Sequence, residues 1–377
     1  MIIKTSPSLN ITDLIGLRSI DPKHRVQTGD TVFKCGRDAI HRVIAQCIKL
    51  GVRQVLIPAS ICAAAIEPVA ALEIPVVSYR LNTDLTPDVL DIESKLKGSS
   101  TAVITVQFFG FPVDLKPLRD LCDLQGSFLI EDCALSLYGQ RGDQPVGSQG
   151  HASIFSWRKF LPVPDGGVLR INDDRLSPAS IAPTAPRLLP SSTGRFVIKS
   201  LLSSVMLSRV SPKSQFLRWA IPTANVQEPF ILDDDYSPSE GNSTLSNWLF
   251  NHMDHQRVID SRRKNASHWF NWVAGRKDVT LVHSTLGEGD VPYGVPVLVH
   301  DAEQVVRFME QHGVLIEAPL NRPYYESQIL KNPDQRYPEI EDMAKRTILL
   351  PVHQSLKRHH VNRVSSLLDG ILATNRS

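Results

Sequence analysis

The stretch Ile154–Ile171 reads IFSWRKFLPVPDGGVLRI. An apolar, strand-like run leads through the basic pair Arg158-Lys159 into a turn broken by prolines, and a glycine pair opens a second strand-like run. A lysine between two strands, beside a rigid proline turn, is held more firmly than a lysine on a surface helix. The alternative is an ordinary surface lysine in a connecting loop, which is the usual environment of lysine. Taken alone, the stretch favours that alternative, so the rest of the chain decides.

The composition is typical of a globular protein with a sizeable core. The chain has 377 residues, of which 42% are hydrophobic and 21% charged. This length predicts two or three domains, or one large α/β domain with an appendage. The formal net charge of +2 gives no global field that would recruit nucleic acid or acidic membranes, so no nucleic-acid partner is expected.

The cysteines indicate a reducing compartment. All 5 are scattered and none has CxxC spacing, which is typical of reduced thiols rather than of a disulfide framework or a zinc site. The opening segment MIIKTSPSLNITDL has no long apolar run and no small-residue cleavage site. No stretch reaches the length of a membrane-spanning helix. We therefore expect a cytoplasmic protein without a metal site.

Short apolar runs alternate with amphipathic patterns through the first half of the chain. Residues 36–50 repeat apolar side chains at helical spacing and stop at Gly51, and the buried strand 55–57, closed by Pro58, follows. Further helices are predicted at 63–72, 91–96 and 115–124 (with Asp114 as N-cap), and strands at 75–79, 102–106, 128–130, 153–156 and 168–171. This order predicts an α/β fold with a mostly parallel sheet covered by helices on both faces. In such sheets the chemistry collects at the carboxyl ends of the strands.

The second half of the chain departs from this order. Residues 174–246 are rich in proline and serine, and we interpret them as an insertion or lid of a large domain, 1–246. Within them, Phe196–Val210 has a basic amphipathic pattern that could contact a membrane, although core or lid packing is the commoner role of such a stripe. Residues 247–377 predict a smaller α+β domain, with helices at 254–273, 302–312 and 361–373 and strands at 295–299 and 314–316.

Three features along the α/β half could serve one cofactor. Gly36 precedes a helix whose free backbone N–H groups can bind a phosphate. Asp132 follows an apolar strand, and a buried carboxylate is costly unless it is paired, for example with a protonated ring nitrogen. Lys159 follows the next strand and could act as a nucleophile. A helix cap, a strand-end carboxylate and a loop lysine are the structural alternatives, but the three together favour pyridoxal phosphate, which requires these parts.

Other cofactor motifs are missing from the sequence. It contains no GxGxxG, GxxxxGK[ST], HExxH or GxSxG pattern. The glycines at 139, 142, 147 and 150 lie in a polar loop, and turn geometry suffices to explain them.

The chain resembles the DegT/StrS sugar aminotransferases, which are fold-type-I pyridoxal phosphate enzymes. The resemblance is carried by EDCA (Glu131–Ala134), the glycine-rich loop, and the pattern FS…K…DGG within Phe155–Gly167. Further landmarks occur in the family's order: CGRDAI, LIPASIC, QFFGFPVDL, SRRKNA and LLPVHQSL. Together they cover nearly the whole chain except about 174–246.

Carried over residue by residue, the resemblance implies a catalytic pair. Lys159 would bind pyridoxal phosphate as a Schiff base, and Asp132 would pair with the pyridine nitrogen. The remaining cofactor-binding positions implied are Gly36, Arg37, Asp38, Cys62, Leu135 and Ser156. Three residues depart from the family pattern: Leu135 replaces a glutamine, Cys62 replaces a ring-stacking aromatic, and Phe160 replaces the asparagine that usually follows the lysine. The approach to Lys159 is also about two residues shorter than usual.

The resemblance implies an aminotransferase that moves an amino group, for example from glutamate, to a nucleotide-linked keto-sugar in polysaccharide or glycoconjugate biosynthesis. It also implies a homodimer with shared active sites. Two alternatives stay open. A pyridoxal phosphate sugar lyase or dehydratase is one, although Lys159 argues against it because those relatives typically have histidine there. A non-catalytic or regulatory protein of the same fold is the other, and the three departures keep it open.

Overall fold

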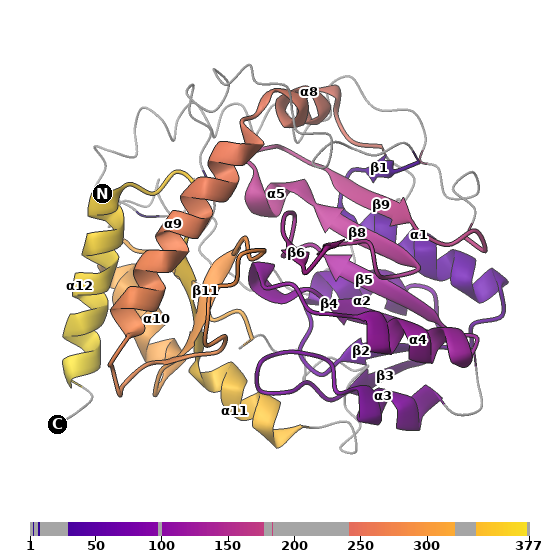
Figure 1. The fold of residues 1–377 in the computed structure, drawn as a ribbon, viewed down its shortest axis with the longest axis horizontal. Coiled ribbons are helices and arrows are strands. Elements are labelled where there is room, and N and C mark those ends of the chain that lie inside the picture. Colours follow the sequence, from indigo (N-terminus) through magenta and orange to yellow (C-terminus); the bar gives the residue numbers. More distant parts are fainter. Residues whose placement is uncertain are drawn as a thin grey trace.

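Seven strands form the main sheet of the computed structural model, in the order β1-β9-β8-β5-β4-β2-β3 (Figure 1). The structure describes residues 29–96, 100–176, 241–320 and 337–374, with the single residues Ile3, Pro7 and Pro183. The predicted helix Phe196–Val210 and most of the predicted insertion lie outside these residues. The strands are β1 (Thr31–Phe33), β2 (Gln54–Pro58), β3 (Val76–Tyr79), β4 (Thr101–Val106), β5 (Phe128–Cys133), β8 (Ala152–Ser156) and β9 (Gly167–Ile171).

The sheet is mostly parallel, which confirms the prediction. Strands β3, β2, β4, β5 and β8 pair in parallel, and only β9 runs antiparallel to its neighbours β8 and β1. Every residue of β4 and β5 is buried, as expected for strands covered on both faces. The carboxyl ends of the parallel strands therefore meet at one edge of the sheet.

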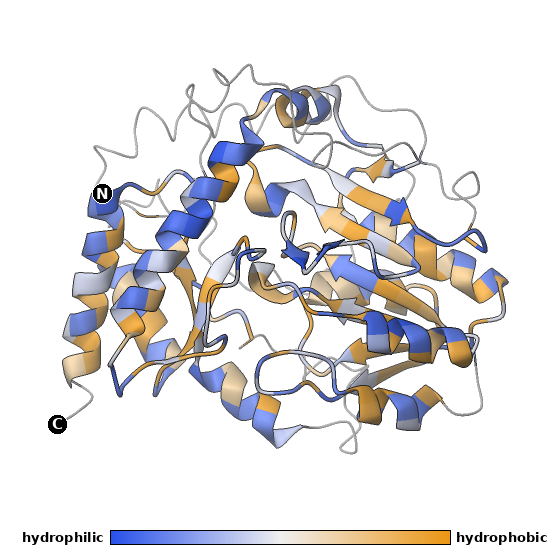
Figure 2. Ribbon diagram, viewed as in Figure 1, coloured by the Kyte–Doolittle hydropathy of each residue, from blue (hydrophilic) through white to orange (hydrophobic). Residues whose placement is uncertain are grey.

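Amphipathic helices flank this sheet, and their apolar faces pack against it to form the core. Helix α1 packs along β8 and β9, and α4 packs against β5. The buried stripe of α1 (Ala39, Ile40, Val43, Ile44 and Cys47) follows the predicted helical spacing. Figure 2 shows the same division, with hydrophobic residues concentrated along the strands and blue faces on the helices. The helices are α1 (Gly36–Lys49), α2 (Ala63–Ala70), α3 (Val89–Leu96) and α4 (Lys116–Leu124).

One helix start differs from the prediction. Helix α4 has Leu115 rather than Asp114 in the N-cap position. The Asp114 carboxylate instead accepts a hydrogen bond from the backbone N–H of Lys116 at 3.0 Å, one position before a true cap. Pro117 is the second residue of the helix, where a backbone N–H would have no partner within the helix. A proline there leaves one donor fewer to satisfy, so the helix can begin without a side-chain cap.

A second, antiparallel sheet has the order β10-β11-β12. The run predicted as a strand at 314–316 makes only an isolated bridge between Val314 and Ile3, whereas the family landmark LLPV forms β12. The predicted domain boundary at 246/247 falls within α8, and the division into 1–246 and 247–377 stays a prediction. The elements are β10 (Thr280–Leu281), β11 (Gly294–Leu298), β12 (Thr347–Pro351), α8 (Thr244–His252), α9 (His255–Val273), α10 (Ala302–Gln311), α11 (Pro338–Arg346) and α12 (Arg358–Thr374).

Short elements complete the described chain. They are the 3-10 turn η3 (Phe108–Gly110), the hairpin of β6 (Gln140–Arg141) and β7 (Gln144–Pro145), and the one-turn helix α5 (Trp157–Phe160). Helix α5 carries Lys159, which the sequence had placed in a loop. No helix among the described residues is long and apolar enough to cross a membrane.

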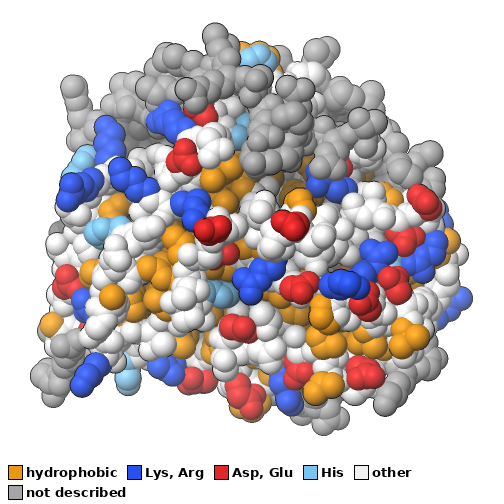
Figure 3. Space-filling view, in the orientation of Figure 1, with side chains coloured by type: hydrophobic (Ala, Val, Ile, Leu, Met, Phe, Trp, Pro, Cys, Tyr) orange, Lys and Arg blue, Asp and Glu red, His pale blue; other side chains and the backbone are white. Residues whose placement is uncertain are grey.

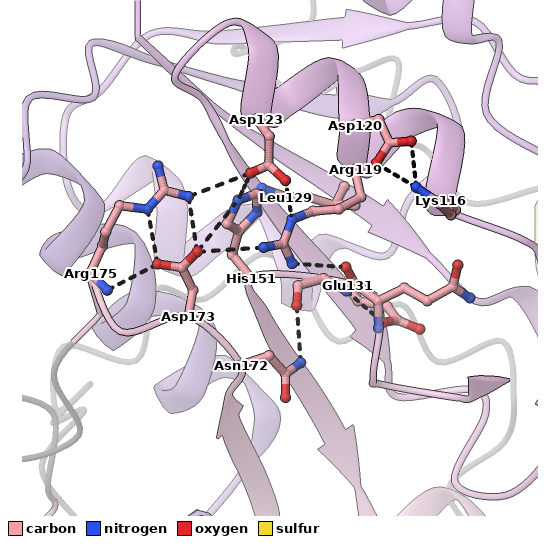
Figure 4. Close-up of polar contacts among 12 residues, drawn as sticks. Lys116, Arg119, Asp120, Asp123, Leu129, Glu131, His151, Asn172, Asp173 and Arg175 are labelled. Atoms are coloured by element: carbon pink, nitrogen blue, oxygen red, sulfur yellow. Dashed lines mark hydrogen bonds and ion pairs between the residues drawn. The ribbon is translucent and has the colours of Figure 1, made fainter.

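A charged network closes the amino-terminal edge of the sheet, opposite the strand ends that carry the predicted site (Figure 4). His151 is fully buried; its Nδ1 accepts from the Leu129 N–H and its Nε2 lies 2.7 Å from the Asp123 carboxylate. Arg175 bonds Asp173 at 2.9 and 3.0 Å, and Arg119 reaches both carboxylates. Because Nδ1 is an acceptor, the neutral imidazole donates through Nε2 to Asp123.

We expect this network to fail in two steps as the pH falls. Burial lowers the pKa of His151, so below the ordinary value of 6.5 the unfolded chain binds a proton that the folded chain does not. Hydrogen bonds from Arg175 lower the pKa of Asp173 to about 2, so stability falls again between pH 3.8 and about 2. In an Asp132→Asn background, which removes the opposite pH dependence of that buried carboxylate, urea midpoints measured at pH ~7.5, ~5.5 and ~3 should decrease in that order.

Asp173→Asn should remove the second decrease and keep the first. Asp120→Asn is the matched control, because Asp120 is an exposed carboxylate on α4 that pairs with Lys116 in an i,i+4 bridge. An equally steep acid decrease in Asp173→Asn and wild type would contradict the assignment to Asp173.

Candidate active site

The carboxyl edge of the sheet brings together the residues that the sequence singled out. Asp132 lies near the end of β5, Ser156 ends β8, and Cys62 follows β2 as the N-cap of α2. Strand β9 is antiparallel, so it begins at this edge, and Gly167 pairs with both Ser156 and Phe33. In Figure 1 the same edge, with α5, faces α9 and β11.

The glycine pair sets the start of α1 against β9. A Cβ on Gly167 would lie 2.1 Å from the carbonyl carbon of Cys35 and 2.4 Å from the nitrogen of Gly36. Gly166 adopts a φ of +123°, donates its N–H to the Lys34 carbonyl at 2.9 Å, and accepts from the Trp157 N–H at 3.0 Å. These contacts require glycine at both positions. They place the amino end of α1 beside the turn that carries Lys159.

A side chain from the first turn of α1, that of Asp38, caps the start of this helix. The Asp38 carboxylate turns back and accepts from the Cys35 backbone N–H at 3.2 Å and from its thiol at 3.3 Å. Burial raises the pKa of Asp38 despite these bonds. Arg37, whose side chain is 41% exposed, pairs with Glu67 at 3.2 Å. The structure thus places Gly36, Arg37 and Asp38 at the site edge, with Asp38 engaged in the capping role.

Asp132 is a buried carboxylate with few partners. It is 6% exposed, and its Oδ1 accepts one hydrogen bond, from the Ala134 N–H at 2.9 Å. Burial raises the pKa of Asp132 to about 6, while that bond and the charge of Lys159 act to lower it. Among the described residues, no cation lies within ion-pair distance of it. A carboxylate in this state fits a cationic group delivered by a ligand.

Lys159 is half-buried on α5 and lies within electrostatic reach of Asp132. Its Nζ is 5.9 Å from the centre of the Tyr293 ring, which stands on the chain just before β11. The structure therefore brings together the two predicted catalytic residues, which are 27 positions apart in the numbering of the sequence. Their roles stay predictions.

The remaining predicted residues occupy the same edge with different exposure. Cys62 is exposed and Ser156 is partly exposed, so both can meet a ligand. Leu135 is partly buried and packs against the main core. A leucine there supplies no hydrogen bond to a bound ring.

Glu131, next to Asp132, has a role that the sequence did not reveal. Its carboxylate accepts from the Gln107 Nε2 at 2.9 Å and from the backbone N–H groups of Gly147 at 2.9 Å and Gly150 at 3.1 Å. A Cβ on Gly150 would lie 2.9 Å from the Cβ of Glu131. Turn geometry alone therefore does not explain the glycine-rich loop, because the loop wraps a buried carboxylate. A glutamate within an otherwise apolar strand was the signal available.

A cavity of about 420 Å³ lies beside α5. Trp157, Tyr138 and Phe250 line it together with Arg170 and Arg263. Figure 3 shows Lys and Arg interspersed with Asp and Glu among the described residues of the face that it draws, in keeping with the small net charge.

The mostly parallel sheet flanked by helices makes this an α/β protein. A sequence model of the DegT/DnrJ/EryC1/StrS aminotransferase family matches residues 31–182 and 249–369, and the chain belongs to this family.

Relatives with named activities support the same class. GDP-perosamine synthase of Vibrio cholerae is 30% identical over 150 residues, which are 38% of this chain and 40% of that protein. The dTDP-4-dehydro-2,3,6-trideoxy-D-glucose 4-aminotransferase of Saccharopolyspora spinosa is 25% identical over 291 residues, 74% of this chain and 68% of that protein.

Solved structures confirm the fold. The aminotransferase TlmJ from Streptoalloteichus hindustanus has a TM-score of 0.71 at 18% identity, covering 100% of both chains. PseC of Helicobacter pylori, an aminotransferase involved in the biosynthesis of pseudoaminic acid, has a TM-score of 0.70 at 14% identity, covering 99% of this chain and 100% of that chain.

The raised pKa of Asp132 generates a stability prediction. Ionising this carboxylate in the folded chain is unfavourable, so its contribution to stability is present below pH 3.8 and lost as the pH rises through about 6. Asp132→Asn keeps the shape and removes the charge, and it should raise the unfolding free energy of the cofactor-free protein at pH ~7.5 by roughly 1–3 kcal/mol.

Chemical unfolding at pH ~7.5 and pH ~4 tests this prediction, because the gain should nearly vanish at the lower pH. Asp120→Asn again serves as the exposed control. A less stable Asp132→Asn protein at the higher pH would show that Asp132 is better satisfied than its single hydrogen bond indicates.

Proposed function

We propose that this protein is a pyridoxal phosphate-dependent aminotransferase that transfers an amino group, for example from glutamate, to a nucleotide-linked keto-sugar. The observation that carries the proposal is Asp132: a buried carboxylate with one hydrogen bond, within electrostatic reach of Lys159, at the carboxyl edge of the sheet. Family membership supports the same chemistry.

The residues of the edge have distinct roles in this proposal. Pyridoxal phosphate, when bound, supplies an aldehyde for covalent attachment and a ring that accepts electrons from the substrate. Lys159 would hold it covalently and, once released, move a proton between the carbon atoms that exchange the amino group. Asp132 would keep the ring nitrogen protonated, an electrostatic contribution of several kcal/mol by comparison with similar groups. Arg37, Ser156 and the N–H groups that open α1 would bind the phosphate.

The substrate class is proposed from the relatives. The Saccharopolyspora spinosa relative is named for a dTDP-linked keto-sugar, and the Vibrio cholerae relative for a GDP-linked amino sugar. A role in polysaccharide or glycoconjugate biosynthesis follows from that class. We further propose a cytoplasmic homodimer with shared active sites, and a division into a large domain, 1–246, and a smaller one, 247–377.

A non-catalytic binding protein of the same fold is the second candidate. Leu135 favours it, because this side chain packs into the core where the family pattern has a polar glutamine. The half-reaction separates the two candidates: bound cofactor should convert to its amine form when glutamate or another amino donor is added. Cofactor that binds but converts with none of the common donors would favour the binding protein.

We expect the purified protein to take up pyridoxal phosphate and to show an absorption band in the near-visible range. Borohydride should bleach the band and leave the cofactor attached at Lys159, where peptide mass spectrometry can locate it. Lys159→Ala should show neither the band nor the attachment, because it removes the amine whose charge acts on Asp132. Lys34, which also lies at this edge, acts on the Asp38 carboxylate instead. Lys116→Ala, on exposed α4, is the control and should behave as wild type.

A wild-type protein that stays colourless and unlabelled with an excess of pyridoxal phosphate would overturn the proposed function.

A further inference from the structure

The carbonyl group that follows Lys159 has no local hydrogen-bond donor. Lys159 lies in the single turn of α5, which closes with the Leu161 N–H bonded to the Trp157 carbonyl at 2.8 Å. The next donors for the Phe160 carbonyl would be at positions 162 to 164, but Pro162 and Pro164 have no N–H. The Val163 N–H is already bonded to the Leu161 carbonyl at 2.9 Å. Phe160 is fully buried, and a buried carbonyl without a partner is costly.

Two side chains from the second half of the chain supply the missing donors. The Arg262 Nη2 on α9 donates to the Phe160 carbonyl at 3.2 Å, and the Gln354 Nε2, after β12, donates to it at 2.9 Å. They are 102 and 194 positions away in sequence. The lysine turn is therefore held by tertiary contacts rather than by its own helix.

Arg262 also connects this turn to the ring that faces Lys159. Its Nη1 donates to the carbonyls of Pro292 at 3.2 Å and Tyr293 at 3.3 Å. Its guanidinium carbon lies 4.4 Å from the centre of the Phe160 ring. Tyr293 is itself tied to η3, because its N–H donates to the Phe109 carbonyl at 2.7 Å. One guanidinium thus fixes both the backbone behind Lys159 and the aromatic ring in front of it.

Burying the Arg262 guanidinium costs folding free energy, so its presence is hard to explain by stability alone. The side chain is fully buried, no carboxylate within the described ranges pairs with it, and its Nε has no hydrogen-bond partner. Burial lowers the pKa of Arg262 to about 10. Buried charges without a counter-charge are weak evidence for stabilisation, and apolar replacements of similar volume are often tolerated. A positional role accounts for a cation at this place in the core.

We propose that Arg262 is a positioning residue which, together with Gln354, holds the Phe160 carbonyl and so directs Lys159 toward Asp132. The inference rests on the proposed function of Lys159 as the attachment site of pyridoxal phosphate. Its expected consequence is that loss of either donor lets the one-turn helix relax, so Lys159 reacts more slowly with an aldehyde at this site.

The test measures borohydride trapping of pyridoxal phosphate on Lys159 by peptide mass spectrometry, scaled to the folded fraction from circular dichroism. Arg262→Met should slow trapping at least about tenfold, the loss expected for a charge-assisted hydrogen bond. Arg262→Lys, which keeps the charge but can serve fewer carbonyls, should recover part of the rate. Lys264→Met is the control, because Lys264 is an exposed cation on the same helix α9.

Gln354→Met gives an independent readout if Arg262→Met does not fold. It removes one donor and also the Gln354 Oε1, which has no partner among the residues that the structure describes, so little stability should be lost. Trapping should still slow several-fold. In the double variant the effect should exceed the product of the single effects by at least about twofold, because both donors serve one carbonyl.

The outcomes separate this inference from the proposed function. Absence of trapping in wild type defeats the proposed function. Trapping in wild type together with unchanged rates in folded Arg262→Met and Gln354→Met defeats the positioning role. Rates that only follow the folded fraction also defeat it, since Arg262 would then be structural.

Discussion

Two buried carboxylates, Glu131 and Asp132, lie near the end of strand β5. The site depends on Glu131 having several hydrogen-bond donors while Asp132 has one. Successive side chains of a strand point to opposite faces. Glu131 meets a shell of donors from Gln107 and the glycine-rich loop, whereas Asp132 meets one backbone N–H. The first carboxylate fastens the loop that leads into β8, and β8 carries the turn with Lys159. The second is left with capacity for a ligand. Exchanging their environments would remove both the anchor and the site.

Asp132 and Arg262, which lie around the turn that carries Lys159, are less well satisfied than Asp173 at the opposite edge. Burial raises the pKa of Asp132 and lowers that of Arg262, so each is held in a state that costs folding free energy at neutral pH. At the amino-terminal edge, by contrast, Asp173 has its pKa lowered by Arg175. Unfavourable charges concentrated where a ligand is expected are typical of functional sites.

Local pattern predicts most of the sheet but little of what holds Lys159. Helix α1 and strands β2, β4 and β5 follow from periodicity, because each buries a continuous stripe or run. Helix α5 is only one turn long and depends on donors more than a hundred positions away, so no window around Lys159 contains its cause. The run SRRKNA was visible as a landmark, but nothing in it distinguishes buried Arg262 from partly exposed Arg263. The predicted site residues meet at one edge because the parallel strands end there. This meeting follows from the order and direction of the strands and not from the spacing of the residues in the sequence.

The packing of Phe160 helps to decide whether the departures from the family pattern indicate loss of the catalytic site. Its ring packs against the Arg262 guanidinium at 4.4 Å, Tyr138 at 5.7 Å and Tyr293 at 5.8 Å. An asparagine amide in this fully buried position would need several hydrogen bonds that these rings cannot supply. The short approach, the two prolines, Phe160, Arg262 and Gln354 therefore form one mutually dependent arrangement. Random loss of a catalytic turn would leave a cavity or an unpaired carbonyl. Here the Phe160 carbonyl has two donors and the Phe160 ring is packed on three sides. These contacts favour an intact site in which tertiary hydrogen bonds hold the lysine turn.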